Sequence, residues 1–102
     1  MKLGKKQELF SILIAEHVIW LYEQGYKVRS GDYFATVGHK ENSNHYSKLA
    51  ADLNLFLDGQ YLTETEDHRI SGEKWETRHE LCRWGGRFND GNHYSLLHHG
   101  RM

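Results

Sequence analysis

Apolar residues recur at helical spacing near the start of the chain. The positions that follow the i, i+3, i+4 pattern are Phe10, Leu13, Ile14, His17, Val18 and Leu21. This periodicity predicts an amphipathic helix over residues 5–24, and Gly25 is expected to end it. Glu16 and His17 interrupt the apolar run, and a bilayer span needs about 20 apolar residues. We therefore expect neither membrane insertion nor a signal peptide.

The rest of the chain reads mainly as short strands. Residues 26–34 and 48–57 are strand-like, and Asp58-Gly59 is a two-residue hairpin signal that leads into residues 60–63. Residues 36–44 are polar and read as an exposed loop. A second helix is expected over residues 71–81 with Ser71 as its N-cap, followed by a glycine turn at residues 84–86 and a last strand over residues 92–96. This order predicts an α+β domain with helices packed on a small antiparallel sheet.

Composition narrows the function classes. The chain has 102 residues, 38% of them apolar and 26% charged, which suits one globular domain, and we expect a monomer. A net charge of -1 argues against nucleic acid as a partner, because such binders normally carry a strongly basic face. The one cysteine, Cys82, has no partner for an internal disulfide and is expected to be a plain thiol. Eight histidines make imidazole chemistry the first place to seek function.

Three residues could form a metal site. Asp52 lies in the apolar strand AADLNLF, where a carboxylate needs a partner. His45 precedes that strand and His93 begins the last one, so the three meet if the two strands are neighbours. Two imidazoles and one carboxylate around Zn²⁺ leave a fourth position for water, as in a catalytic site. Asp90, three residues before His93, could then act as the general base.

These residues resemble a known family. The pattern Ser-x-His followed by Ala and Asp (Ser43, His45, Ala50, Asp52), and an acidic residue three before a His (Asp90, His93), is similar to that of zinc peptidases of bacterial cell walls. That family includes D-alanyl-D-alanine carboxypeptidases and phage L-alanyl-D-glutamate endolysins. The segments AADLNLFLDGQYL, GEKWETRHELCRWGGRF and NDGNHYSL also resemble its small phage members. The resemblance implies one Zn²⁺ on His45, Asp52 and His93, Asp90 as catalytic acid/base, and the fold shared with the hedgehog signalling domain.

Two positions depart from the family pattern. Lys48 stands where many members have Gly after the first metal His, a change that concerns the local turn. Ala35 stands where many members have an Arg that holds the substrate's acidic group. The cations and the imidazole that could bind substrate instead are Arg29, His39, Lys40 and Arg87.

We therefore expect a zinc endopeptidase that cuts the L-Ala-D-Glu bond in the peptidoglycan stem peptide. By the resemblance it would be a phage lysis enzyme, held in the host cytoplasm until lysis and then acting on the cell wall. The alternatives are a D-Ala-D-Ala carboxypeptidase and a non-enzymatic phage protein that keeps the fold and metal; a metal-dependent nuclease is disfavoured by the charge balance.

Other polar residues have simpler interpretations. His17 is expected in the core or at its boundary, His68 and His79 on the surface, and His98 and His99 as a terminal surface pair. Trp84 is expected to pack over its glycine turn, although a cleft wall is also possible. The acidic cluster of Glu64, Glu66 and Asp67 is read as a solvated turn in preference to a Ca²⁺ site, because its oxygens lack the regular alternation of an EF-hand loop.

Overall fold

The computed structural model describes residues 1–31 and 48–100. Its elements, in chain order, are α1 (Leu3–Glu23), β1 (Tyr26–Ser30), β2 (Ala50–Leu57), β3 (Gln60–Tyr61), the 3₁₀ turn η1 (Thr65–His68), α2 (Arg69–Thr77), β4 (Cys82–Trp84), the 3₁₀ turn η2 (Gly85–Phe88) and β5 (His93–Leu96). The predicted α+β class with a small antiparallel sheet is confirmed.

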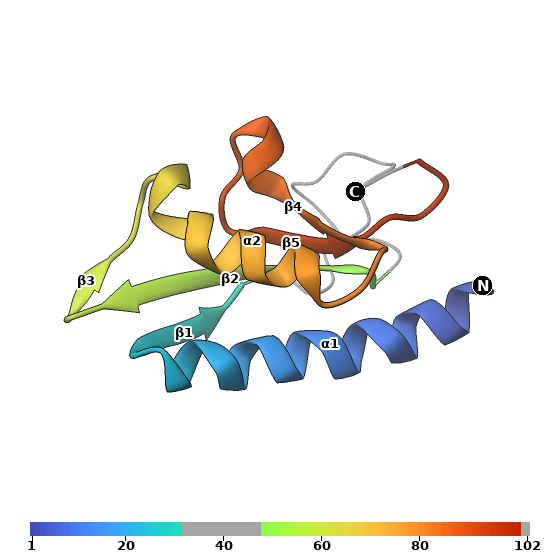
Figure 1. Ribbon diagram of the computed structural model, residues 1–102, viewed down its shortest axis with the longest axis horizontal. Helices are drawn as coiled ribbons and strands as arrows, with labels where there is room; N and C mark the ends of the chain where they lie inside the picture. Colours follow the sequence, from blue (N-terminus) through green and yellow to red (C-terminus); the bar gives the residue numbers. More distant parts are fainter. Residues whose placement is uncertain (32–47, 101–102) are drawn as a thin grey trace.

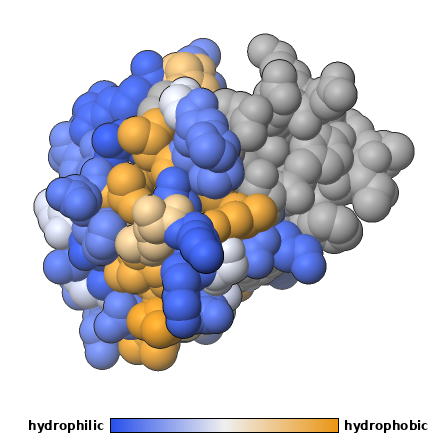
Figure 2. All heavy atoms as spheres, turned by 90° about the vertical axis from the view of Figure 1, so that its right-hand side faces the viewer, coloured by the Kyte–Doolittle hydropathy of each residue, from blue (hydrophilic) through white to orange (hydrophobic). Residues whose placement is uncertain are grey.

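The first helix forms where the apolar spacing predicts it. α1 buries Phe10, Leu13, Ile14, His17 and Leu21, and Gly25 follows its end with a φ of +97°, which a residue with a side chain rarely adopts. Its outer side keeps Ile12 and Ile19 exposed. Figure 2 views the molecule from the right-hand side of Figure 1 and shows hydrophobic residues in a band between hydrophilic ones. No helix in the described parts of the chain is long and apolar enough to cross a membrane.

The sheet has the strand order β1-β2-β5-β4, and β3 pairs with β2 through the hairpin. All pairs are antiparallel. The predicted hairpin is confirmed, since Asp58 and Gly59 both have positive φ, as a two-residue turn of this kind requires. In Figure 1, α2 lies across the sheet and α1 runs beside β1.

Alternation along β2 separates a core face from a polar face. Ala51, Leu53 and Leu55 are fully buried and belong to the hydrophobic core, which also holds residues of both helices. Asp52 and Asn54 alternate with them and therefore extend from the opposite face. The candidate chemistry thus lies on the side of the sheet away from the helices.

The second helix differs from the prediction. α2 begins at Arg69, and Ser71 lies inside it with its hydroxyl bonded to other buried groups, so the predicted N-cap at Ser71 was wrong. The turn predicted at residues 84–86 is preceded by a further short strand, β4, which pairs with β5 and which the sequence did not indicate. Trp84 packs over its glycine turn, as predicted, with Gly86 against one part of the indole and Gly72 of α2 against another.

Candidate metal centre

Asp52 and His93 lie directly opposite each other on neighbouring strands. β2 pairs with β5 so that Asp52 is in register with His93, and opposite residues of an antiparallel pair extend to the same side of the sheet. His93 Nδ1 is 3.8 Å from Asp52 Oδ1, and the two side chains are 6% and 21% exposed, respectively. The structure therefore brings together two of the three expected metal ligands.

The separation of these two atoms suits a shared cation. Zinc bonds of about 2.0–2.2 Å at tetrahedral angles put two ligand atoms about 3.4 Å apart. The observed 3.8 Å is close to that value and longer than a hydrogen bond. Zinc also binds both imidazole nitrogens and carboxylate oxygens, so the pair could supply two of the four ligands of a tetrahedral site.

The remaining expected ligand falls in a part of the chain without a structural description. His45 lies outside the described residues, and so do His39, Lys40 and Ala35. Within residues 1–31 and 48–100, no group of three His, Cys, Asp or Glu side chains is placed to hold a metal ion. Of the three expected metal ligands, the structure therefore describes Asp52 and His93.

Asp90 lies in the tight loop that leads into β5. Its amide N–H donates to the Gly85 carbonyl at 2.9 Å, and its own carbonyl accepts from the His93 amide at 3.1 Å. A Cβ at Gly85 would lie 2.3 Å from the Asp90 carbonyl oxygen and 2.6 Å from His93 Cβ. Only glycine at position 85 permits this fold of the loop, which holds the exposed Asp90 beside the strand that carries His93.

A row of polar groups continues from the Asp52–His93 pair along the sheet. Asn92 Nδ2 donates to Asn54 Oδ1 at 3.1 Å, and the Tyr61 hydroxyl donates to the same oxygen at 3.4 Å. Arg29 of β1, a predicted substrate-binding residue, is in register with Asn54 of β2. Its guanidinium lies 4.6 Å from the Phe56 ring centre. Arg29 is thus an exposed cation on the same face as Asp52.

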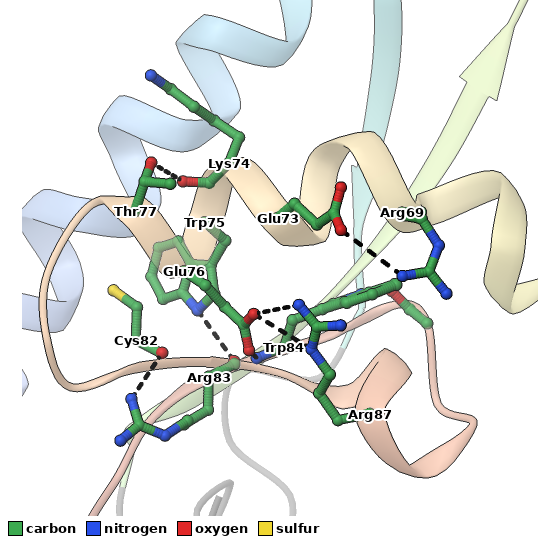
Figure 3. A network of polar contacts seen from close by, with 11 residues as sticks. Arg69, Glu73, Lys74, Trp75, Glu76, Thr77, Cys82, Arg83, Trp84 and Arg87 are labelled. Carbon is green, nitrogen blue, oxygen red and sulfur yellow. Dashed lines mark hydrogen bonds and ion pairs between the residues drawn. The ribbon is translucent and has the colours of Figure 1, made fainter.

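Arg87 has a different environment. Its Nη2 lies 2.7 Å from Glu76 Oε1, and its guanidinium lies 5.3 Å from the Trp84 ring centre (Figure 3). The second carboxylate oxygen of Glu76 accepts from the Trp84 amide at 3.1 Å. The structure thus places this predicted substrate-binding cation in an ion pair that ties η2 to α2.

His68 is buried, so its predicted place on the surface was wrong. The residue is 3% exposed, and its Nε2 lies 3.2 Å from the Leu62 carbonyl, to which it donates. Burial lowers the pKa of His68, and the carboxylates of Asp67 and Asp90 act in the opposite sense. The burial comes from packing of η1 near the loop before β5, a long-range contact with no local sequence signal.

A second buried polar cluster joins α1 to α2. Arg78 Nε donates to His17 Nδ1 at 2.9 Å, so the neutral imidazole carries its proton on Nε2, which donates to Ser71 Oγ at 3.0 Å. Ser71 Oγ is in turn 2.6 Å from the Tyr94 hydroxyl. Burial is the main reason that the pKa of His17 falls to about 3. Since His17 and Ser71 are closed off from solvent, this pair belongs to the core and not to a nucleophilic site.

Other predictions had mixed outcomes. His98 and His99 do pair, with ring centres 4.0 Å apart, but His98 is buried and lies 3.1 Å from Lys6 Nζ, so its surface assignment was wrong. The acidic residues lie at η1, with Glu64 as its N-cap, and Glu64, Glu66 and Asp67 are all exposed, as expected for a solvated turn. Glu66 also pairs with Arg69 at 2.8 Å. Burial raises the pKa of the Cys82 thiol to about 12, which agrees with an unreactive thiol.

Comparisons with protein-family models, curated proteins and solved structures find no match for this chain. The similarity to zinc peptidases, drawn from the residues themselves, stays a prediction. The function must therefore be argued from the arrangement of the site.

Proposed function

We propose that the protein is a zinc peptidase that hydrolyses the L-Ala-D-Glu bond of the peptidoglycan stem peptide. The observation that carries the proposal is the register of β2 with β5, which places Asp52 opposite His93 with ligand atoms 3.8 Å apart. The proposal includes the hedgehog/DD-peptidase fold, the role of a phage lysis enzyme, and residence in the host cytoplasm until lysis.

A second feature supports the comparison with that family. Lys48 has a φ of +58°, in the left-handed region that favours glycine. This is the position at which many members of the resembled family have Gly. The backbone turn that a glycine would favour is therefore present in this chain, although the residue is lysine.

Each residue has a defined task in the proposed reaction. His45, Asp52 and His93 would hold Zn²⁺, which when bound supplies an activated water and polarises the scissile carbonyl. Asp90, exposed beside the strand of His93, accepts the proton of the attacking water. It then passes that proton to the leaving amine as the C–N bond breaks, so the products are one carboxyl end and one amino end.

The environment of the cations favours the endopeptidase over the carboxypeptidase. A carboxypeptidase must hold a terminal carboxylate with a cation, for which a bidentate arginine is well suited. Arg87 already binds Glu76. Arg83 lies on the polar face by its register with Ser95, but its Nη1 donates to the Glu80 and Cys82 carbonyls. Arg29 is exposed on the same face, and an extended stem peptide offers other contacts besides one carboxylate.

Metal content tests the site. We expect one zinc per chain by elemental analysis and loss of bound zinc in the His93→Ala variant. His99→Ala is the matched control, because His99 is exposed and follows the end of β5 in the chain, and it should keep full zinc. Full zinc occupancy in a variant with His45→Ala, Asp52→Ala and His93→Ala would refute the site.

Catalysis tests the role of Asp90. Asp90→Asn should retain zinc and lose hydrolysis of purified walls by about 10²- to 10⁴-fold, the usual effect of removing a general base. Asp58→Asn is the control, because Asp58 occupies the exposed hairpin turn, which asparagine also favours. Mass analysis of the released muropeptides should find new L-Ala carboxyl ends and D-Glu amino ends. Release of free D-Ala from intact stems would establish the carboxypeptidase instead.

A further inference from the structure

A side-chain hydrogen bond joins β2 to the segment just before β5. Asn92 Nδ2 donates to Asn54 Oδ1 at 3.1 Å, and the Tyr61 hydroxyl donates to the same oxygen at 3.4 Å. The carbonyl oxygen of a side-chain amide has two lone pairs, so Asn54 can accept both donors at once. Asn54 therefore ties together three segments: β2, β3 and the entry to β5.

This link lies where the backbone pairing beside the metal centre ends. Asp52 and His93 are the last register pair of β2 and β5. One residue further along β2, the Leu53 N–H still donates to the Asn92 carbonyl at 2.9 Å. Asn54 follows Asp52 by two residues, so it extends from the same face of the sheet, about 7 Å further along the strand. The Asn54–Asn92 bond thus continues the pairing of the two strands on the face that carries the proposed ligands.

His93 depends on this link more than Asp52 does. β2 lies between β1 and β5, and the Asp52 carbonyl accepts from the Gly31 amide at 2.6 Å on the side of β1. Asp52 is thus held from both sides within an eight-residue strand. His93 is the first residue of β5, and the chain enters it from the loop that carries Asp90. The direction of its imidazole therefore depends on how the preceding residue, Asn92, is held.

We propose that Asn54 is a positioning residue of the metal centre: by holding Asn92, it fixes the start of β5 so that the His93 imidazole stays opposite Asp52. The inference rests on the proposed function, because it requires zinc on Asp52 and His93. Metal ligands must be held within about 0.5 Å of the productive geometry, and the residues that support them supply this precision. Removal of such supporting residues typically weakens metal binding by about 10- to 100-fold.

Zinc affinity, measured by competition with a chromophoric chelator, tests this inference without any cleavage. Asn54→Ala and Asn92→Ala should each weaken zinc binding by about ten-fold, the lower end of the usual range, because the effect passes through one intervening residue. The double variant should bind zinc no more weakly than either single variant, since both substitutions break the same bond. Gln60→Ala is the matched control, because it truncates an exposed amide in the neighbouring strand β3, and it should keep the affinity of the parent protein.

Cobalt spectroscopy separates positioning from a general loss of stability. Co²⁺ binds in place of zinc, and its visible absorption depends on the geometry of its ligands. At saturating cobalt, Asn54→Ala should shift or weaken this absorption, whereas Gln60→Ala should leave it unchanged. Asn92→Ala removes the same bond without altering β2, so it provides the test if Asn54→Ala fails to fold.

The outcomes also separate the positioning role from the proposed reaction. Unchanged zinc affinity in both single variants, losses that add in the double variant, or unaltered cobalt absorption would overturn the inference and leave the metal centre in place. Coupled losses of zinc affinity in a protein that cleaves no peptidoglycan bond would keep the positioning role and refute the reaction. A parent protein that binds no zinc would refute both.

Discussion

The Gly72→Ala substitution tests the packing that holds the loop of Asp90 and His93. A Cβ on Gly72 would lie 2.0–2.3 Å from three atoms of the Trp84 indole, so the ring or the helix would have to move by about 1 Å to reach the shortest real contacts near 3.0 Å. The ring has little room to move, because Gly86 also lies close to it: a Cβ there would fall 2.2–2.4 Å from three of its atoms. The indole Nε1 also donates to the Gly91 carbonyl at 2.7 Å.

The expected loss follows from two opposing terms. Extra methyl groups in a tightly packed core cost about 1–3 kcal/mol, and the upper end applies here because the indole is fully buried and held from several sides. Alanine is better than glycine in a helix by about 0.5–1 kcal/mol, which offsets only part of that cost. We therefore expect the free energy of unfolding to fall by about 2 kcal/mol.

Urea unfolding followed by tryptophan fluorescence measures this change. Gly4→Ala is the matched control, since Gly4 is in α1 and a Cβ there would meet nothing within 4 Å. The control should gain up to about 1 kcal/mol from helix propensity alone. If Gly72→Ala is as stable as the parent protein, the indole is not packed tightly against the two glycines and this account of the loop is wrong.

Two further predictions concern the stability of the fold. The pKa of His17 is lowered from 6.5 to about 3 in the folded protein, so the unfolded chain binds a proton at His17 more tightly. The contribution of neutral His17 to the free energy of unfolding is therefore fully present above pH 6.5 and is lost as the pH falls toward 3. Urea unfolding should show a loss of about 2 kcal/mol between pH 8 and pH 5, and His17→Gln should flatten this dependence; an unchanged slope would show that His17 is not its source. Lys48→Gly should gain about 0.5 kcal/mol, because glycine avoids the left-handed strain, whereas Lys27→Gly in β1 should lose stability. Equal losses in both variants would contradict that explanation.

Features that depend on neighbouring residues were predictable from the sequence. The spacing of Phe10, Leu13 and Ile14 is enough to define the buried side of α1, and Asp58-Gly59 defines a hairpin through its own backbone preferences. The strand of Asp52 was also predicted. The alternation in AADLNLF places Asp52 and Asn54 on one face and the leucines on the other, so the carboxylate reaches the polar face without being deeply buried.

Features that depend on distant residues were not predictable. Ser71 satisfies the rule for an N-cap, yet its hydroxyl binds His17 and Tyr94, which lie 54 and 23 residues away in the chain. His68 has the polar surroundings of a surface residue and is buried because η1 packs near the loop before β5. In both cases a tertiary contact overrides a correct local preference.

The position of Asp90 illustrates the same limit within the candidate site. Its spacing from His93 made it a candidate base, but spacing alone does not hold the loop in place. That depends on Gly85, which leaves room for the Asp90 carbonyl, and on Trp84, which binds the Gly91 carbonyl. The Trp-Gly-Gly sequence therefore has two tasks: it closes the core against α2, and it fixes the backbone on both sides of the proposed base. A substitution in this packed unit should disturb folding and the site together, whereas Asp90→Asn should disturb only the reaction.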